Sequence, residues 1–180
     1  MKVKINNVRL AFPQLFEATT VNGEGKPAFS ATFILPQNHP DIAALNSAID
    51  KVAEEKWGPK TGDILKALRA AGKVALRNGD EKSNYSGFAG NLYVSARNAV
   101  RPTVLDANRT PLTQADGRPY AGCYVNAILD IWAQDNGYGK RINASLGGVQ
   151  FYRDGDAFAG GGAASTDEFD AVDEPVSDLV

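Results

Sequence analysis

The sequence predicts a mainly β protein with some helical content, and three observations support this fold class. Short runs of alternating apolar and polar residues recur along the chain, and such alternation is typical of strands with one face in a core. Glycine is abundant, with 18 residues among 180, which favours tight turns between strands. The length is sufficient to bury a core, and the composition requires no second domain.

The first strand is expected over residues 1–12. Apolar residues alternate with polar ones up to Ile5 and resume one residue out of phase at Val8. Such a change of phase predicts a bulge or bend near Asn6 and Asn7. Pro13 is expected to end this strand.

A hairpin and a helical segment are expected next. Residues 21–27 are rich in turn formers and lead into a second strand over residues 28–35. A helix is expected after Pro40, because Ile42, Leu45, Ile49 and Val52 recur at helical spacing. Gly58 and Pro59 end it, and a shorter helix is expected over residues 63–71.

Two later strands, residues 91–102 and residues 123–132, carry the pattern that bears most on function. On each strand one face is apolar, as expected for a core. The other face carries Tyr93 and Arg97 on the earlier strand and Tyr124 and Trp132 on the later one. If the two strands are neighbours, these side chains form one aromatic and basic surface. Such a surface suits single-stranded nucleic acid, because bases stack on rings and phosphates pair with basic groups.

Each of these four residues also has an ordinary structural interpretation. The rings can be half-buried sheet residues, and this holds especially for Trp132, since tryptophan is usually largely buried. Arg97 can pair with Asp130 at the surface. Taken together, however, several rings and a guanidinium on one face favour the binding surface.

Further candidates for contacts with nucleic acid lie around these strands. Tyr85 and Phe88 can flank the same groove or pack two rings onto the barrel from a glycine-rich turn. Lys140 and Arg141 follow a predicted hairpin turn at residues 136–137 and can bind phosphates or simply aid solubility. Arg101 stands before Pro102, where it can contact a strand of DNA or mark a rigid end of its own strand.

The last strand is expected over residues 141–152, with a bulge or bend at Gly147 and Gly148. Before it, residues 106–122 form a long polar loop, and long loops in compact domains are often functional or mobile. Arg109 and Arg118 of this loop are possible clamps for a bound strand.

Signals of an enzyme or of a metal site are poor, so we expect no catalytic residue, metal or cofactor. His39 is the only histidine, and Cys123 shares the apolar face of its strand. The segment that begins at Asp106 imitates a calcium loop, but Pro111 and Gly117 stand where that loop needs glycine and glutamate.

The charge is divided between two parts of the chain. Beyond Arg153 there are eight acidic residues and no Lys or Arg, which leaves thirteen acidic against nineteen basic residues, a net charge of +6, in residues 1–153. Such a division indicates nucleic-acid binding or an interaction tail. We expect a binding domain over residues 1–156 and a flexible glycine-rich linker with an acidic tail over residues 157–180. The tail residues expected to contact partners are Asp167, Glu168, Phe169, Asp170, Asp173, Glu174 and Asp178.

Three runs of the sequence together resemble a family of phage single-stranded-DNA-binding proteins that was long catalogued as a domain of unknown function. The runs are G-N-L-Y-V-S-A-R-N-A-V-R-P, G-R-P-Y-A-G-C-Y-V-N-A and G-V-Q-F-Y-R-D-G-D-A-F, and the acidic tail adds to them. The resemblance implies an OB-fold, a curved antiparallel β-barrel with inserted helices, that coats single-stranded DNA during phage replication or recombination. It also implies that the tail contacts partners or competes with DNA.

The family's functional positions are carried only onto residues inside these runs, which are Tyr93, Arg97, Arg101, Pro102, Tyr120, Gly122 and Tyr124. Tails of this kind often finish on an aromatic residue, whereas this chain finishes on Val180. The partner of the tail therefore stays open.

The sequence thus predicts a non-enzymatic protein that binds single-stranded DNA with little sequence preference. With one cysteine and no apolar signal or membrane segment, we expect it in the cytoplasm, that of the host cell if it is phage-encoded. Replication or recombination proteins are expected partners of the tail. The alternative is a β-rich structural or assembly protein of a phage particle that uses the same surface for protein contacts, and a small hydrolase is a distant third. Oligomeric state and the choice between DNA and RNA stay open.

Overall fold

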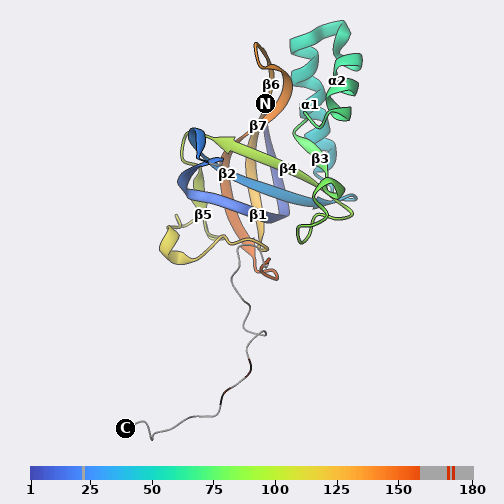
Figure 1. Ribbon diagram of the computed structural model, residues 1–180. Helices are drawn as coiled ribbons and strands as arrows, with labels where there is room; N and C mark the ends of the chain where they lie inside the picture. The colour runs from blue at the N-terminus through green and yellow to red at the C-terminus, as the bar shows by residue number, and fades with distance from the viewer. Residues whose placement is uncertain (22, 159–169, 171, 173–180) are drawn as a thin grey trace, which may run out of the picture.

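The computed structural model in Figure 1 describes residues 1–21, 23–158, 170 and 172 and forms a closed β-barrel with a helical insertion. Five strands close the barrel in the order β1, β2, β4, β7, β6 and back to β1. The prediction of a mainly β chain with inserted helices is confirmed. The strands of the barrel are β1 (Lys2–Val21), β2 (Glu24–Pro36), β4 (Asn91–Asn98), β6 (Tyr124–Asn136) and β7 (Gly139–Arg153).

Two short strands extend this sheet. β3 (Leu76–Asn78) pairs antiparallel with β4, and β5 (Thr103–Leu105) pairs parallel with β7. The barrel itself closes through a parallel contact between β4 and β7, whose paired residues are Arg97 and Ser145.

Strand β1 is longer than the sequence predicts. The expected irregularity near Asn7 is confirmed, because the register with β6 shifts between Ile5 and Val8 and Asn7 takes a φ of 54°. The prediction that Pro13 ends the strand is wrong. Pro13 lies within a second register shift, between Ala11 and Gln14, where a residue without an N–H group is tolerated.

A bulge in β7 also confirms its prediction. Ile128 of β6 pairs with Gly148, and the next residue, Leu129, pairs with Leu146. Gly147 is therefore the extra residue, and a Cβ atom there would lie 3.1 Å from the carbonyl oxygen of Ile128. The bulge shifts the phase so that Leu146 and Val149 are both buried.

The helical insertion packs against one end of the barrel. Helix α1 (Ile42–Trp57) and helix α2 (Thr61–Ala70) follow the predicted ranges closely and lie beside the β6–β7 hairpin. Leu45 and Ile49 are fully buried from α1, and each such burial contributes about 1.5–3 kcal/mol. Trp57 also donates a hydrogen bond of 2.9 Å to Asp135 at the hairpin.

A second, smaller apolar cluster lies outside the main core. It comprises Ala11, Ile34, Phe88 and Tyr93, with Phe158 packed against it. Phe88 belongs to the segment of residues 79–90, so this segment covers part of the outer surface of β1, β2 and β4.

The described body extends slightly beyond the expected domain boundary at residue 156. Phe158 donates its backbone N–H to Ala121 at 3.0 Å, and its ring lies 4.2 Å from the Arg9 guanidinium. We therefore propose that the binding domain extends at least to Phe158.

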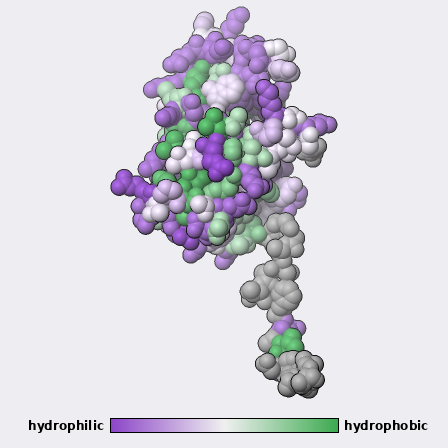
Figure 2. All heavy atoms as spheres, turned by 90° about the vertical axis from the view of Figure 1, so that its left-hand side faces the viewer, coloured by the Kyte–Doolittle hydropathy of each residue, from purple (hydrophilic) through white to green (hydrophobic). Residues whose placement is uncertain are grey.

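The surface is mixed in polarity. On the face in Figure 2, apolar residues gather over the middle of the barrel between hydrophilic ones. In the part of the chain that the structure describes, no helix combines the length and apolar character needed to span a membrane.

Candidate nucleic-acid interface

A groove of about 390 Å³ crosses the outer surface of β4, β7 and β6. Besides the buried Tyr93, its most prominent side chains are one exposed ring and five basic residues, Trp132, Lys73, Arg77, Lys82, Arg97 and Arg141. No Asp or Glu is among the described residues that line it. We call this feature the basic groove, and its composition matches a strand of phosphates better than a neutral or cationic ligand.

Arg97 and Trp132 come together across β7. Arg97 is paired with Ser145, and the Ser145 hydroxyl accepts a hydrogen bond of 3.0 Å from the Trp132 indole. The condition that the two strands are direct neighbours is not met, because β7 lies between β4 and β6. The same closure of the barrel nevertheless places both residues in one groove.

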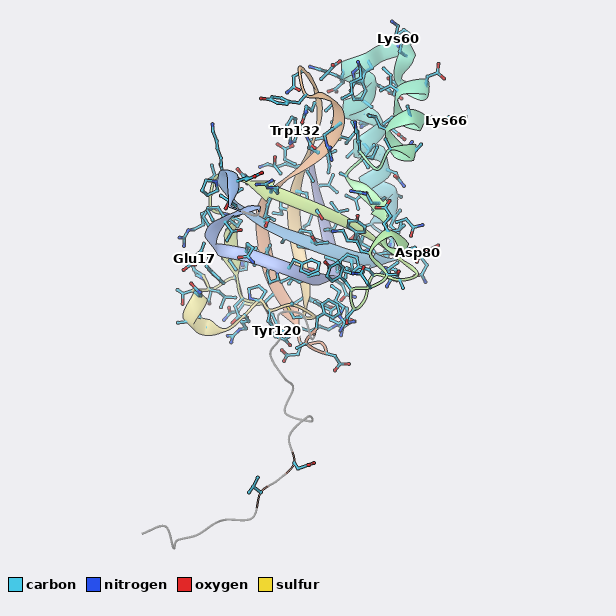
Figure 3. All side chains as sticks on the ribbon, in the orientation of Figure 1. Glu17, Lys60, Lys66, Asp80, Tyr120 and Trp132 are labelled. Carbon is cyan, nitrogen blue, oxygen red and sulfur yellow. The ribbon has the colours of Figure 1, made fainter. Side chains whose placement is uncertain are left out.

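Trp132 is 42% exposed despite its size. Because its indole N–H is already bonded to Ser145, the ring is held in place while part of its surface remains free. Figure 3 places Trp132 toward the end of the barrel where the helices lie. An indole fixed and open in this way can stack on a base.

Several basic side chains of the basic groove have no acidic partner among the described residues. Arg77 forms an ion pair of 2.6 Å with Glu81. Within the described residues, Lys73, Lys82, Arg97 and Arg141 form no ion pair. Four positive charges therefore remain available to phosphates.

Tyr93 and Phe88 require a correction. Both are 1% exposed, because the segment of residues 79–90 folds over Tyr93 and places the Phe88 ring 5.4 Å from it. The Tyr93 hydroxyl donates to Glu81 at 3.1 Å, and burial raises the pKa of that phenol. Neither ring has a free face for a base. The stacking role expected of Tyr93 is therefore wrong in this structure, and Phe88 takes the second of its two expected roles, packing onto the barrel.

Tyr124 lies far from Trp132. Eight residues separate them along β6, which corresponds to roughly 26 Å. The half-buried Tyr124 ring is stacked by the Arg153 guanidinium at 3.7 Å and approached by Arg9 at 5.8 Å. The predicted single surface is therefore divided, and Tyr124 belongs to a different part of the barrel from the basic groove.

The remaining basic candidates also separate. Arg141 lines the basic groove, whereas Lys140 forms an ion pair of 3.7 Å with Asp135 at the hairpin. Arg101 is exposed and lies 5.7 Å from the ring of Phe29, outside the groove. Only Arg141 of these three joins Arg97 and Trp132.

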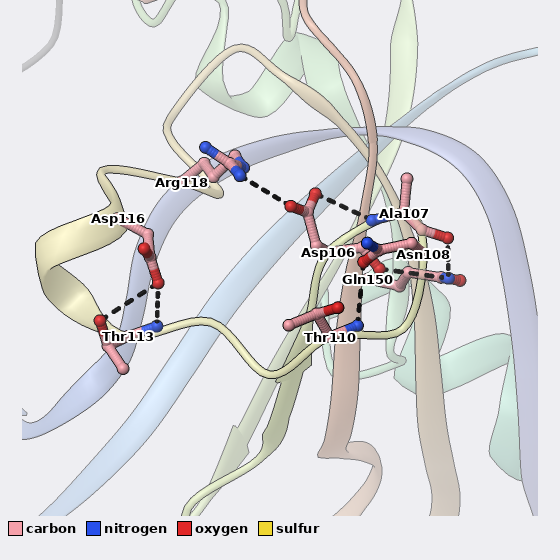
Figure 4. A network of polar contacts seen from close by, with 8 residues as sticks. All are labelled: Asp106, Ala107, Asn108, Thr110, Thr113, Asp116, Arg118 and Gln150. Atoms are coloured by element: carbon pink, nitrogen blue, oxygen red, sulfur yellow. Dashed lines mark hydrogen bonds and ion pairs between the residues drawn. The ribbon is translucent and has the colours of Figure 1, made fainter.

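The long loop of residues 106–122 is held by its own polar contacts, which Figure 4 shows. Arg118 donates to Asp106 at 2.7 Å, and this bond lowers the pKa of the Asp106 carboxyl and raises that of the guanidinium. Thr113 and Asp116 cap a short turn within the loop. Arg118 is thus engaged in loop structure, which argues against a role as a clamp.

His39 and Cys123 have structural environments. His39 accepts a hydrogen bond from Asp41 N–H at its Nδ1 atom, and its Nε2 atom lies 2.8 Å from the Asn6 carbonyl oxygen. Cys123 is fully buried, and desolvation raises the pKa of its thiol to about 11. Among the described residues no cluster of three metal-ligating side chains occurs.

Sequence reasoning missed three basic residues of the basic groove, Lys73, Arg77 and Lys82. They lie in and beside β3, in a stretch that the alternation marks as a short strand followed by a polar turn. Three basic residues within a short stretch indicate a basic patch, but their position beside Trp132 depends on how β3 pairs with β4. The tail residues Asp167, Glu168, Phe169, Asp173, Glu174 and Asp178 lie outside the described residues, and Asp170 is exposed.

Comparison with known proteins gives one close relative in sequence. "Putative protein p50" of Acyrthosiphon pisum secondary endosymbiont phage 1 is 53% identical over 175 residues, which cover 94% of this chain and 93% of that protein.

Solved structures agree with the fold. The single-stranded DNA-binding protein from bacteriophage Enc34 in complex with ssDNA is 25% identical, with a TM-score of 0.73, 87% of this chain and 88% of that chain being covered. A further structure of the single-stranded DNA-binding protein from bacteriophage Enc34 is 29% identical, with a TM-score of 0.69, 94% of this chain and 90% of that chain being covered. Bacteriophage T7 gp2.5, a single-stranded DNA binding protein, is 11% identical with a TM-score of 0.56 over 92% and 98% of the two chains, which supports the fold alone.

These likenesses confirm the predicted OB-fold and the predicted family resemblance. The family model described as "Enterobacter phage Enc34, ssDNA-binding protein" matches residues 1–180, which is the whole chain. This is a family of DNA-binding proteins and not of enzymes. The chain therefore belongs to the Enc34 ssDNA-binding protein family.

Proposed function

We propose that this protein binds single-stranded DNA through the basic groove. The observation that carries the proposal is the fixed, half-open Trp132 ring beside four basic side chains that form no ion pair with any described residue. Membership of a ssDNA-binding family and the likeness to a solved complex with ssDNA support it.

In the basic groove, an aromatic ring binds a nucleobase and basic side chains bind the phosphates. One base stacks on Trp132, a contact worth about 1–3 kcal/mol. Arg97 and Arg141 neutralise phosphates on either side of the ring, and Lys73 and Lys82 extend the positive surface. Every base offers a π-face, so little sequence preference is expected. Duplex DNA binds weakly, because its bases are already stacked.

A direct test is fluorescence anisotropy with a labelled oligo-dT and with a duplex of equal length. Trp132→Ala and the double variant Arg97→Ala/Arg141→Ala are each expected to weaken binding to oligo-dT about tenfold or more. The matched controls are Tyr152→Ala, an exposed ring outside the groove, and Arg69→Ala, a surface base of α2. If neither the full-length protein nor the protein without residues 166–180 binds oligo-dT, the assembly-protein alternative takes its place.

We further propose that the protein serves phage DNA replication or recombination and that its acidic tail both competes with DNA and recruits partner proteins. The support is the charge division, in which a body of net charge +6 is joined to eight acids. A tethered acidic segment has a high effective concentration near a basic groove. Phe169 and Leu179 add apolar anchors that solubility alone does not require.

Deletion of residues 166–180 tests the competition. The truncated protein is expected to bind oligo-dT more tightly than the full chain at low salt, with the difference shrinking as salt rises. Unchanged or weaker affinity at low salt contradicts competition. Recruitment is tested separately, by asking whether a replication or recombination protein is retained by the full chain and lost by the truncated one.

A further inference from the structure

A second cleft, of about 360 Å³, lies next to the segment of residues 79–90. That segment borders both features, because Lys82 lines the basic groove while Tyr85 and Phe88 line the cleft. We call it the aromatic cleft, and its lining includes Phe12, Gln14, Asn84, Tyr85, Phe88 and Phe158.

Two rings of the aromatic cleft are open to solvent. Phe12 is 42% exposed and Tyr85 is 46% exposed, and their centroids lie 5.1 Å apart in an edge-to-face arrangement. Both rest on the buried Phe88 ring, at 5.9 Å and 6.2 Å. The two rings are therefore held from beneath while part of each remains free, as at Trp132.

The backbone at Phe12 is unusual for such a residue. Phe12 takes a φ of 48°, a left-handed conformation that bulky L-residues rarely adopt. It stands in the register shift of β1 between Ala11 and Gln14, and the shift directs its ring outward. Because the ring is not buried, core packing does not compensate this strain, and strain of this kind often marks a binding position.

The segment that carries Tyr85 is fixed. Gly90 N–H donates to Asp80 at 2.8 Å, and Gly79 packs so closely that a Cβ atom there would overlap the Phe88 carbonyl. Gly87 has a φ of 88° and leaves room for the Phe158 ring. Tyr85 is thus presented by a braced turn.

The lining of the aromatic cleft indicates its ligand. Among the described residues that line it there is no Lys, Arg, Asp or Glu, and its polar members are the uncharged Gln14, Asn84 and Ser86. Uncharged amides and hydroxyls beside open rings suit the edges and faces of bases, whereas phosphates need the charges of the basic groove. The aromatic cleft is also connected to the basic groove. Lys82 of the groove lies over the Tyr93 ring at 5.4 Å, and that ring packs against Phe88 of the cleft.

We propose that Phe12 and Tyr85 form a second base-stacking site for the strand of DNA that occupies the basic groove. The strand passes from Trp132 across residues 79–90 and places a later base in the aromatic cleft. This inference rests on the proposed function, and it adds a second contact point that only a sufficiently long strand reaches.

The test compares two oligo-dT lengths, about 5 and roughly 20 nucleotides, with the full chain. The span covered by one OB-fold ranges over about 4–16 nucleotides, so the short strand fills one site and the long strand reaches both. The double variant Phe12→Leu/Tyr85→Leu keeps apolar volume but removes both π-faces. It is expected to bind the long strand about tenfold more weakly and the short strand as the unaltered protein does.

Two comparisons separate stacking from other roles. Tyr85→Phe keeps the ring and is expected to retain affinity, and Tyr152→Ala removes an exposed ring outside the cleft and is expected to do the same. The leucine variants should leave the dependence of affinity on salt unchanged, whereas Lys82→Ala should reduce it by about one phosphate contact.

The outcomes distinguish the two proposals. If the leucine variants bind the long strand like the unaltered protein, or lose affinity equally at both lengths, the second stacking site is wrong. If the protein binds neither strand even after deletion of residues 166–180, the proposed function itself fails. Loss confined to the long strand, with Trp132→Ala weakening both lengths, supports the two-site path.

Discussion

Trp132 and Tyr93 show how the same outward parity on a strand leads to opposite environments. Trp132 is half exposed and bonded only at its indole N–H. Tyr93 is enclosed by Phe88, and its hydroxyl is bonded to Glu81. The difference arises from the segment that packs over each ring. Whether an outward-facing ring can stack on a nucleobase therefore depends on that packing as well as on its position along the strand.

Substitution of Tyr93 tests its structural role. Tyr93→Ala is expected to lower the free energy of unfolding by about 3–5 kcal/mol, because it removes a buried ring. Tyr93→Phe keeps the ring and removes one hydrogen bond, at a cost of about 0.5–1.5 kcal/mol. Urea denaturation measures both, and Tyr93→Phe should keep its affinity for oligo-dT. A marked loss of binding by a stable Tyr93→Phe protein would return Tyr93 to the DNA contacts.

Cys123 provides a second prediction at this scale. Its thiol is buried, and a pKa of about 11 keeps it protonated at pH 8. Because the thiolate is the reactive form, the native protein is expected to resist a thiol reagent at pH 8 and to react once unfolded in urea. Rapid labelling of the native protein would contradict the buried position.

At the scale of elements, the loop of residues 106–122 is braced by charge in addition to the apolar contacts that Leu112 and Tyr120 make with the main core. The Asp106–Arg118 bond joins its two ends, and the Arg118 guanidinium also lies 5.9 Å from the Phe151 ring of β7. The loop is therefore tied both to itself and to the barrel.

Removal of this brace is expected to loosen the loop without affecting DNA binding. Arg118→Ala should increase proteolysis within residues 106–122 while leaving oligo-dT affinity within about twofold, since Arg118 lies outside the basic groove. The pKa of Asp106 is lowered in the folded chain, so its stabilising effect is present above the ordinary value of about 4 and is lost as the pH falls through that lowered pKa. Limited proteolysis of the unaltered protein at pH 7 and over a descending pH series below about pH 4 should show the same loosening at the low end of the series. Loss of DNA affinity in Arg118→Ala would instead indicate a clamp.

At the scale of the whole molecule, alternation predicted which residues of each strand face inward. Val94 and Val125 are buried as expected, because parity along a strand is a local property. The order of strands was not accessible in this way, and the insertion of β7 between β4 and β6 follows only from closure of the barrel. The exposure of Phe12 was equally inaccessible, because it depends on a register shift between β1 and β2.

Salt dependence is the prediction that belongs to the whole chain. If Arg97, Arg141, Lys73 and Lys82 each meet a phosphate, log affinity for a single strand should fall with log salt with a slope of about −3, at about −0.7 for each contact. Titrations at several salt concentrations, performed after deletion of residues 166–180, measure the slope without the tail's charges. A slope near zero would exclude an electrostatic groove.

The barrel is joined between β4 and β7 by the single parallel pair of Arg97 and Ser145. The basic groove lies directly over this seam, with Arg97 on one strand and Arg141 and Ser145 on the other. A DNA strand bound across this seam would stabilise the contact between β4 and β7, because separating the two strands would require the DNA to dissociate. Amide hydrogen exchange along β4 and β7 should then slow when DNA is bound. Bound DNA would thus contribute to the closure of the barrel that binds it.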